Sequence, residues 1–179
     1  MSRTDRKVHV LAIHPFSRGL AFALFEAPLS PIDWGVKDIR GKEKNARSLE
    51  VAKQLIEQHQ PDVLVLEDCA SPYNRRARRI HRLQLLIANY ATGQATEVHS
   101  YTRSNIRECF KAVGAATRYE IAQAIASQIT AFGHRLPPLR KLWMSEDVRM
   151  GLFDAVSFIM TFYSRMEPLA ERIDEAVDR

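Results

Sequence analysis

The sequence predicts an α/β fold built on a mixed five-stranded sheet, in which three antiparallel strands are followed by two parallel strands and helices flank the sheet. Three apolar runs separated by turns open the chain, and a fully apolar run at 63–66 follows a segment with helical spacing. Such a run is typical of a strand covered on both faces. With 179 residues and 46% hydrophobic content, we expect one domain over 1–166 and a polar C-terminal tail over 167–179.

Composition narrows the class of partner. Lys and Arg number 26 against 21 Asp and Glu, a formal charge of +5, which favours a polyanionic partner where the positive charge is clustered. Cys69 and Cys109 lie far apart and show neither metal-ligand nor disulfide spacing, as expected in a reducing compartment. No apolar run approaches the roughly 20 residues that span a bilayer. We therefore expect a cytoplasmic protein without membrane contact.

The first half of the chain predicts strands and then a helix. Residues 8–13 and 20–26 are apolar runs joined by a short polar turn, which predicts an antiparallel hairpin. Residues 32–38 form a third run. Residues 43–58 have helical spacing, and Pro61 ends that helix before the central strand.

A long, arginine-rich helix is predicted after the central strand, with Ser71 as its cap and Pro72 in its first turn. Five of its arginines fall within eight residues: Arg75, Arg76, Arg78, Arg79 and Arg82. Few acids interrupt this run. Two interpretations of these arginines therefore stay open: they contact phosphate groups, or they form a solvated face of the helix.

Capping residues place the next elements. Residues 96–100 form a short strand, and Thr102 caps a brief helix that ends at Phe110. Thr117 and Glu120 form a capping box, which predicts a helix that ends near Phe132.

The segment 133–144 is rich in Pro and basic residues and predicts a surface loop, with its Trp143 partly buried. Ser145 is the predicted cap of the final helix. Asp147 lies seven residues before Asp154 and so is a candidate substitute ligand on the same helical face. Acids directly after a cap also interact favourably with the helix dipole, and we prefer that interpretation.

Two acids end the central strand. Glu67 and Asp68 follow the apolar run, and open α/β sheets bind ligands at the carboxyl ends of their strands. Glu67 is the main candidate, with capping of the strand end in solvent as its alternative. Asp68 is expected to point to the opposite side of the sheet.

The order of these elements is that of the ribonuclease H-like architecture, and the motifs resemble the RuvC family of Holliday-junction resolvases over nearly the whole chain. Four segments carry the resemblance in the right order: 12–26 (AIHPFSRGLAFALFE), 61–68 (PDVLVLED), 101–125 (YTRSNIRECFKAVGAATRYEIAQAI) and 151–160 (GLFDAVSFIM). The resemblance implies that Glu67 and Asp154 are catalytic metal ligands. It also implies Mg²⁺ or Mn²⁺ as cofactor.

The family's pattern is broken at two positions. His14 stands where the family has its first catalytic aspartate, and Gly151 stands where it has a further acid or histidine. An imidazole cannot bridge two ions as a carboxylate does, and it suits transition metals better than Mg²⁺. Three interpretations of His14 stay open: a catalytic residue that contacts phosphate or transfers a proton, a ligand of a modified metal site, or a remnant in an inactive site.

Binding residues are implied as well. Arg107 and Arg118 fall on basic positions that face DNA or the scissile phosphate in the family. The full set of candidate nucleic-acid-binding residues is Arg18, Arg75, Arg76, Arg78, Arg79, Arg107 and Arg118. Further along the chain, Arg135, Arg140 and Lys141 extend this basic set, and Tyr73, Tyr101 and Trp143 are candidates for stacking on bases.

Three functions follow. The first is a divalent-metal-dependent endonuclease for branched DNA, acting as a homodimer through the helix that begins near Pro72. The second is a nucleic-acid-binding accessory module of the same fold that lacks catalysis. The third, a nucleotide-binding relative of actin and the sugar kinases, is disfavoured because glycine-rich phosphate loops are missing from the sequence.

Overall fold

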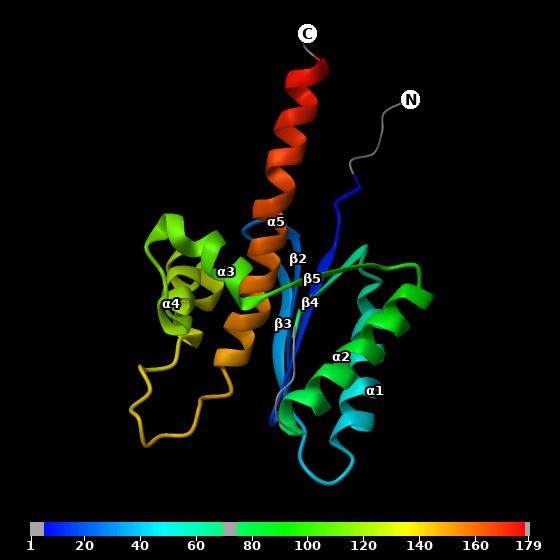
Figure 1. Cartoon of the computed structure of the whole chain (residues 1–179), viewed down its shortest axis with the longest axis vertical. Helices are drawn as coiled ribbons and strands as arrows, with labels where there is room; N and C mark the ends of the chain where they lie inside the picture. The colour runs from blue at the N-terminus through cyan, green and yellow to red at the C-terminus, as the bar shows by residue number, and fades with distance from the viewer. Residues whose placement is uncertain (1–5, 70–74, 178–179) are drawn as a thin grey trace.

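A five-stranded mixed sheet forms the centre of the protein (Figure 1). The computed structural model describes residues 6–69 and 75–177, with the backbone alone described for residues 75–76 and 167–177. The strands are β1 (Val10–Phe16), β2 (Gly19–Ala27), β3 (Ser30–Asp38), β4 (Val63–Glu67) and β5 (Glu97–Tyr101). Their order is β3-β2-β1-β4-β5, with β1, β2 and β3 antiparallel and with β4 and β5 parallel to β1. The predicted fold class is confirmed.

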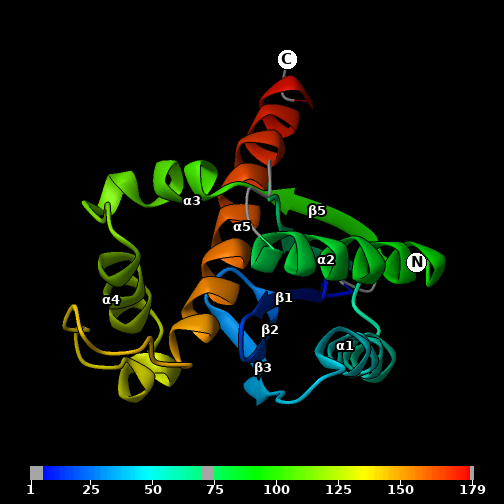
Figure 2. The same ribbon diagram turned by 60° about the horizontal axis from the view of Figure 1, so that its bottom comes forward.

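Helices cover both faces of this sheet, as the turned view makes clear (Figure 2). On one face lie α1 (Lys44–His59) and α2 (Arg75–Gly93); on the other lie α3 (Arg103–Phe110), α4 (Arg118–Gln128) and α5 (Met150–Val177), with two short 3₁₀ turns at Lys111–Val113 and Thr130–Arg135. Each face has its own buried apolar cluster. Successive side chains of β1 point to opposite faces of the sheet and so contribute to both clusters. Val10 and Ala12 pack toward α5, while Leu11 and Ile13 pack toward α1 and α2.

The predicted hairpin between β1 and β2 is confirmed, and its turn requires a glycine. Phe16 pairs with Gly19, so only Ser17 and Arg18 form the turn. Gly19 has a φ of +155°, and a Cβ at this position would lie 1.8 Å from the Lys37 carbonyl oxygen. The close approach of β3 therefore excludes any side chain there.

Local capping signals predicted two helix starts correctly. Thr102 and Thr117 each accept a hydrogen bond from the backbone N–H three residues on, and Asn105 and Glu120 complete the two capping boxes. The end predicted for the second of these helices is wrong, because Ile129 is extended and α4 stops at Gln128. Ser71 and Pro72 lie outside the described residues.

The predicted start of the final helix is also wrong. The helix begins at Met150 and not after Ser145, which is exposed. The chain turns at Asp147 instead: its carboxylate accepts from the Arg149 N–H at 2.9 Å and its carbonyl from the Met150 N–H at 3.0 Å. Asp147 thus lies outside the helix, and the helical register that related it to Asp154 does not exist.

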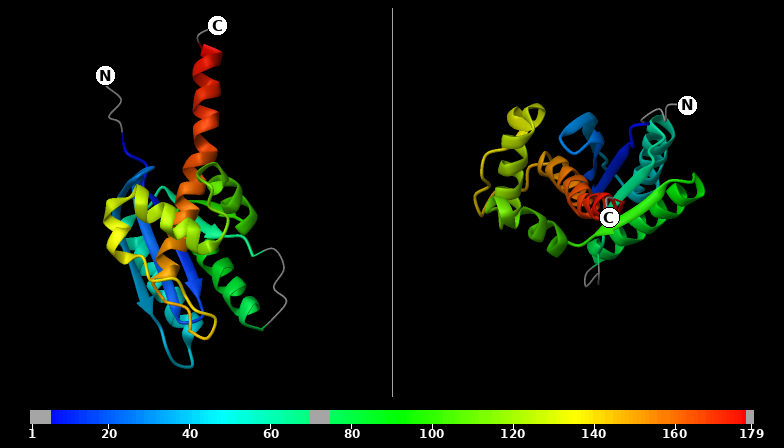
Figure 3. Two further views of the ribbon diagram at one scale, coloured as in Figure 1. Left: turned by 90° about the vertical axis from the view of Figure 1, so that its left-hand side faces the viewer. Right: turned by 90° about the horizontal axis from the view of Figure 1, so that it is seen from above.

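The backbone of α5 stays helical to Val177 and extends past the other elements (Figure 3). Cys69 and Cys109 are half-buried free thiols, and burial raises the pKa of Cys69. Among the described residues, no helix is both long and apolar enough to span a membrane.

Candidate functional site

The candidate site lies where β1 and β4 end, beneath α5. His14 shares the face of β1 that packs on α5, and Glu67 shares the same face of β4. Asp154, on α5, faces them both. His14 Nδ1 lies 3.5 Å from Glu67 Oε2, and its Nε2 lies 3.4 Å from Asp154 Oδ2. The imidazole therefore stands between the two carboxylates that the resemblance singles out.

Arg103 joins the same two carboxylates from the other side. Its Nε donates to Glu67 Oε1 at 2.9 Å and its Nη2 to Glu67 Oε2 at 3.2 Å. Its Nη1 donates to Asp154 Oδ1 at 2.7 Å. The guanidinium also lies 5.5 Å from the centroid of the Phe158 ring. One planar cation thus holds three of the four carboxylate oxygens.

Arg118, the first residue of α4, completes the neutralisation of Asp154. Its Nε donates to Oδ1 at 2.9 Å and to Oδ2 at 3.1 Å, and its Nη2 also donates to Oδ2. The same guanidinium forms an ion pair with Glu146 in the loop before α5. Arg103 and Arg118 together therefore pair with three carboxylates: Glu67, Asp154 and Glu146.

The protonation of the site follows from its burial. Burial raises the pKa of Asp154, but the neighbouring His14, Arg118 and Arg103 outweigh that effect and hold the pKa of this carboxyl at about 2. Burial lowers the pKa of His14, against the attraction of Asp154, and Nδ1 makes no hydrogen bond. Burial also lowers the pKa of Arg103, but both carboxylates outweigh it and raise that pKa. Arg103 and Arg118 supply positive charge beside the carboxylates, while burial, by lowering the pKa of His14, opposes a positive charge on that imidazole.

The ring of Phe16 fills the space beside Gly151 that a side chain would need. A Cβ at this position would lie 3.0 and 3.2 Å from two carbons of Phe16 and 3.3 Å from the Ala21 Cβ. Phe16 in turn stacks on His14 with ring centroids 6.4 Å apart. An acidic side chain at position 151 would need Phe16 to move.

These residues do not fit a pair of divalent ions. Two ions about 4 Å apart need a bridging carboxylate, and His14 stands where that ligand is expected. The oxygens of Glu67 and Asp154 already accept hydrogen bonds from guanidinium groups. No group of three or more His, Cys, Asp or Glu suited to a metal occurs within residues 6–69 and 75–177.

The other acidic candidates lie apart from this cluster. Asp68 is exposed, and its N–H donates to the Tyr101 carbonyl at 2.8 Å, so the strand pairing continues for one residue beyond Glu67. The carboxylate of Asp147 is paired with Arg149, with Oδ2 2.7 Å from Nη2, and this ion pair lowers its pKa.

A basic pocket of about 350 Å³ opens beside Asp154. Its charged lining consists of Arg103, Arg107, Arg118 and Asp154, and Arg107 is exposed. A second pocket of about 290 Å³ shares Arg118 and adds Arg18 and Arg140. The structure thus brings three of the predicted binding arginines, Arg18, Arg107 and Arg118, to adjoining pockets on the α5 side of the sheet.

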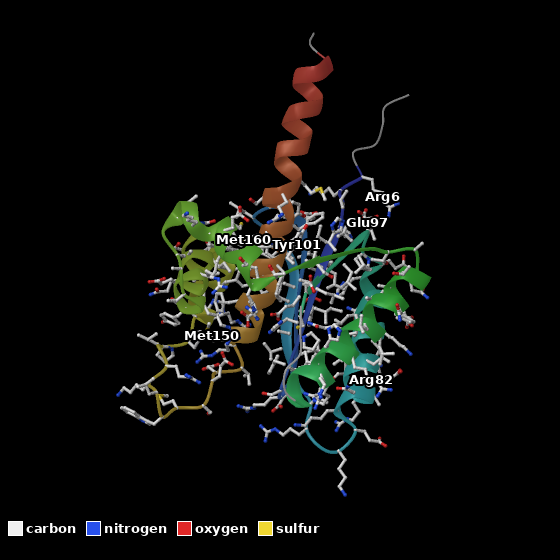
Figure 4. The ribbon with its side chains drawn as sticks, in the orientation of Figure 1. Arg6, Arg82, Glu97, Tyr101, Met150 and Met160 are labelled. Atoms are coloured by element: carbon white, nitrogen blue, oxygen red, sulfur yellow. The ribbon has the colours of Figure 1, made fainter. Side chains whose placement is uncertain are left out.

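The remaining candidates lie elsewhere. Arg78 is exposed on α2, and Arg79 donates to Asn45 Oδ1 at 2.7 Å, which ties α2 to α1. Figure 4 marks Arg82 on α2, across the sheet from Met150 of α5. The side chains of Arg75 and Arg76, and all of Tyr73, lie outside what the structure describes. Tyr101 is buried, which removes it as a stacking surface.

Sequence reasoning missed Arg103. A signal was available: Thr102 caps a helix directly after β5, and parallel strands β4 and β5 place Tyr101 beside Glu67. The first residue of that helix must then lie at the strand end next to Glu67.

The fold is the ribonuclease H-like α/β fold. RuvC of Thermus thermophilus, solved alone and in complex with a Holliday junction substrate, matches at 17% identity and a TM-score of 0.62, over 89% of this chain and 96–97% of RuvC. The fowlpox virus Holliday junction resolvase matches at 17% identity and a TM-score of 0.53, over 90% of this chain and 99% of its own. No family model and no curated protein sequence matches the chain.

Proposed function

We propose that this protein is a DNA-binding module with the fold of the Holliday-junction resolvases, and that it binds branched DNA. In this proposal Arg103 and Arg118 occupy the place of metal ions at the carboxylates Glu67 and Asp154. The observation that carries the proposal is the pocket beside Asp154, which Arg103, Arg107 and Arg118 line. Arg103 and Arg118 pair with the carboxylates of the site, and the exposed Arg107 is the arginine offered to phosphate. Guanidinium groups match the bidentate geometry of phosphate. Arginines on phosphates position a nucleic acid without reading its sequence, so the preference is for backbone shape.

The fold likeness supports branched DNA as the substrate. The matched structures are those of proteins named as Holliday junction resolvases or solved with a junction, and the match spans nearly the whole of both chains. The formal charge of +5 favours a polyanion.

Self-association belongs to the same proposal. A four-way junction has two-fold symmetry, and a homodimer presents two sites with that symmetry. The exposed face of α2 carries Leu85 and Leu86, which are 52% and 40% exposed, beside Arg78 and Arg82. An apolar patch on a helix that faces away from the sheet suits contact with a second copy.

A metal-dependent endonuclease is the second candidate. It is favoured by one observation: Glu67 and Asp154, the two acids retained from the family pattern, face each other across the site. Mg²⁺ or Mn²⁺ would be held by these two residues. Ligation would require Arg103 and Arg118 to release the carboxylates, and for that reason the binding module is the better-supported function.

A binding experiment tests the first candidate. The wild-type protein is titrated against a synthetic four-way junction and a linear duplex of the same sequences, in EDTA and over a range of salt. We expect tighter binding to the junction and weaker binding after Arg107→Ala. Equal affinity for both DNAs would contradict the proposal.

A further inference from the structure

The loop that joins α4 to α5 carries an exposed aromatic and aliphatic tip that the site does not use. Every residue from 138 to 146 is exposed. Leu142 is 96% exposed and Trp143 is 79% exposed, which overturns the expectation that Trp143 is partly buried. Figure 1 shows this segment, yellow to orange, projecting at the end of the molecule where α5 begins.

A β-turn places these two side chains at the outermost point. The Met144 N–H donates to the Lys141 carbonyl at 3.0 Å, so Leu142 and Trp143 occupy the two corner positions of the turn. Gly, Pro, Asn, Asp and Ser are the usual corner residues, because each favours the turn backbone. Two large apolar corners gain nothing for the fold of this loop, which points to contact with another molecule.

Both ends of the loop are anchored to the rest of the protein by side-chain contacts. At the start, the Tyr119 hydroxyl donates to the carbonyl of buried Pro137 at 2.9 Å. At the end, Glu146 pairs with Arg118, and Met150 is buried at the start of α5. Anchored ends limit the positions that the turn can occupy, which reduces the conformational entropy that the loop loses on binding.

The charge around the tip indicates what it contacts. Lys141 Nζ lies 5.3 Å from the centroid of the Trp143 ring, and Arg140 precedes it. Arg140 also lines the second pocket together with Arg18 and Arg118. Arg118 borders both pockets, so arginines connect the candidate site to the loop. Glu146 and Asp147 also line the second pocket, where they pair with Arg118 and Arg149. A flat ring beside cations suits a nucleobase with its phosphates.

We infer that Trp143 stacks on a base exposed at the branch point of DNA, with Arg140 and Lys141 on the adjacent phosphates. This inference rests on the proposed function and names the part of the DNA that the loop recognises. A continuous duplex offers no open base face along its length, whereas strands that part at a branch point do. The loop therefore distinguishes branched from linear DNA, while the arginines of the pockets hold the backbone.

The test compares wild type, Trp143→Phe and Trp143→Ala for binding to a four-way junction and to a relaxed, covalently closed circular duplex, which has neither open ends nor unpaired loops, all in EDTA. We expect Trp143→Ala to weaken junction binding by about tenfold, to leave duplex binding unchanged, and Trp143→Phe to retain most of the affinity. Leu139→Ala, in the same loop but before the turn, is the matched control. Thermal unfolding of all variants should match wild type because these side chains are exposed.

Fluorescence supplies an independent reading of stacking. Trp34, the other tryptophan, packs edge-on against Phe132 with centroids 5.1 Å apart, so Trp143 is the exposed fluorophore. Junction DNA should quench wild-type emission and leave that of Trp143→Phe unchanged.

Failures of the two proposals can be told apart. Wild type that prefers the junction, with Trp143→Ala keeping the full preference, overturns the inference and leaves the proposed function standing. Wild type that does not prefer the junction overturns both. Unchanged junction binding with lost self-association in Trp143→Ala assigns the loop to a protein contact and also overturns the inference.

Discussion

Arg103 donates two hydrogen bonds to the carboxylate of Glu67, from Nε to Oε1 at 2.9 Å and from Nη2 to Oε2 at 3.2 Å. A third bond from the same guanidinium reaches Asp154. The positive charge that this pair of acids needs is thus part of the polypeptide. The stability of the site should then depend on Arg103 and not on added cations.

Replacing Arg103 with Met should destabilise the protein and create a dependence on divalent ions. The change leaves Glu67 without its partner, and we expect a loss of about 2–4 kcal/mol in the free energy of unfolding, below the upper range because the Arg103 side chain is 37% exposed. Mg²⁺ or Mn²⁺ should raise the melting temperature of Arg103→Met and leave that of wild type unchanged.

Arg107→Met is the matched control, since Arg107 lines the same pocket but is exposed. It should unfold like wild type. An equal metal-induced rise in the melting temperature of wild type and Arg103→Met would show that the carboxylates are already open to cations.

Asp154 should contribute to stability in a pH-dependent way. Its pKa in the folded protein is about 2, below the ordinary 3.8, so its contribution is present above about pH 4 and is lost as the pH falls toward 2. The contribution is about 2 kcal/mol at neutral pH. Urea unfolding of wild type and Asp154→Asn should show a difference that shrinks by most of this amount between pH 5 and pH 2.5. A constant difference would contradict the ion pairing.

Gly151→Ala should destabilise α5, although alanine favours helices more than glycine does. The new Cβ would lie 3.0 Å from Phe16, and we expect a loss of about 1 kcal/mol or more. Phe16→Leu should recover part of the loss in a double-mutant cycle. Gly93→Ala is the control, because a Cβ there meets nothing within 4 Å. A stabilised Gly151→Ala would contradict the close contact between this position and Phe16.

The exposed face of α2 should control self-association. Charges introduced by Leu85→Glu with Leu86→Glu should shift the protein to monomer in sedimentation equilibrium, because the apolar contact would be replaced by repulsion. Val113→Glu, at an exposed apolar residue that follows α3, should leave the association unchanged. A wild-type protein that is monomeric at high concentration would contradict the dimer proposal.

The sheet and most helix starts were predictable because their signals are local. Apolar runs such as 63–66 and the capping boxes at Thr102 and Thr117 depend on residues within a few positions of one another. The start of α5 was mispredicted because Ser145 has the chemistry of a cap, whereas the chain turns two residues later at Asp147.

In the candidate site, the sequence indicated the acidic residues Glu67 and Asp154 but not the arginine, Arg103, that pairs with them. Glu67 follows from its place at a strand end and Asp154 from the family resemblance, but Arg103 reaches them through a side chain from a third element. Such a contact depends on tertiary placement. The exposure of Trp143 was not predicted, because an aromatic residue is usually buried at least in part. In this chain the turn from Lys141 to Met144 presents Trp143 to solvent.

The most direct measurement incubates wild type, Glu67→Gln and Asp154→Asn with a labelled four-way junction in Mg²⁺, Mn²⁺ and EDTA, and scores both binding and strand breaks. We expect wild type to bind the junction in EDTA without added metal and to leave every strand intact in EDTA and in either metal, because Arg103 and Arg118 already pair with the carboxylates. Metal-dependent strand breaks made by wild type and abolished in both variants would contradict the proposal that arginines keep metal ions from the carboxylates. They would establish the second candidate function, a metal-dependent endonuclease.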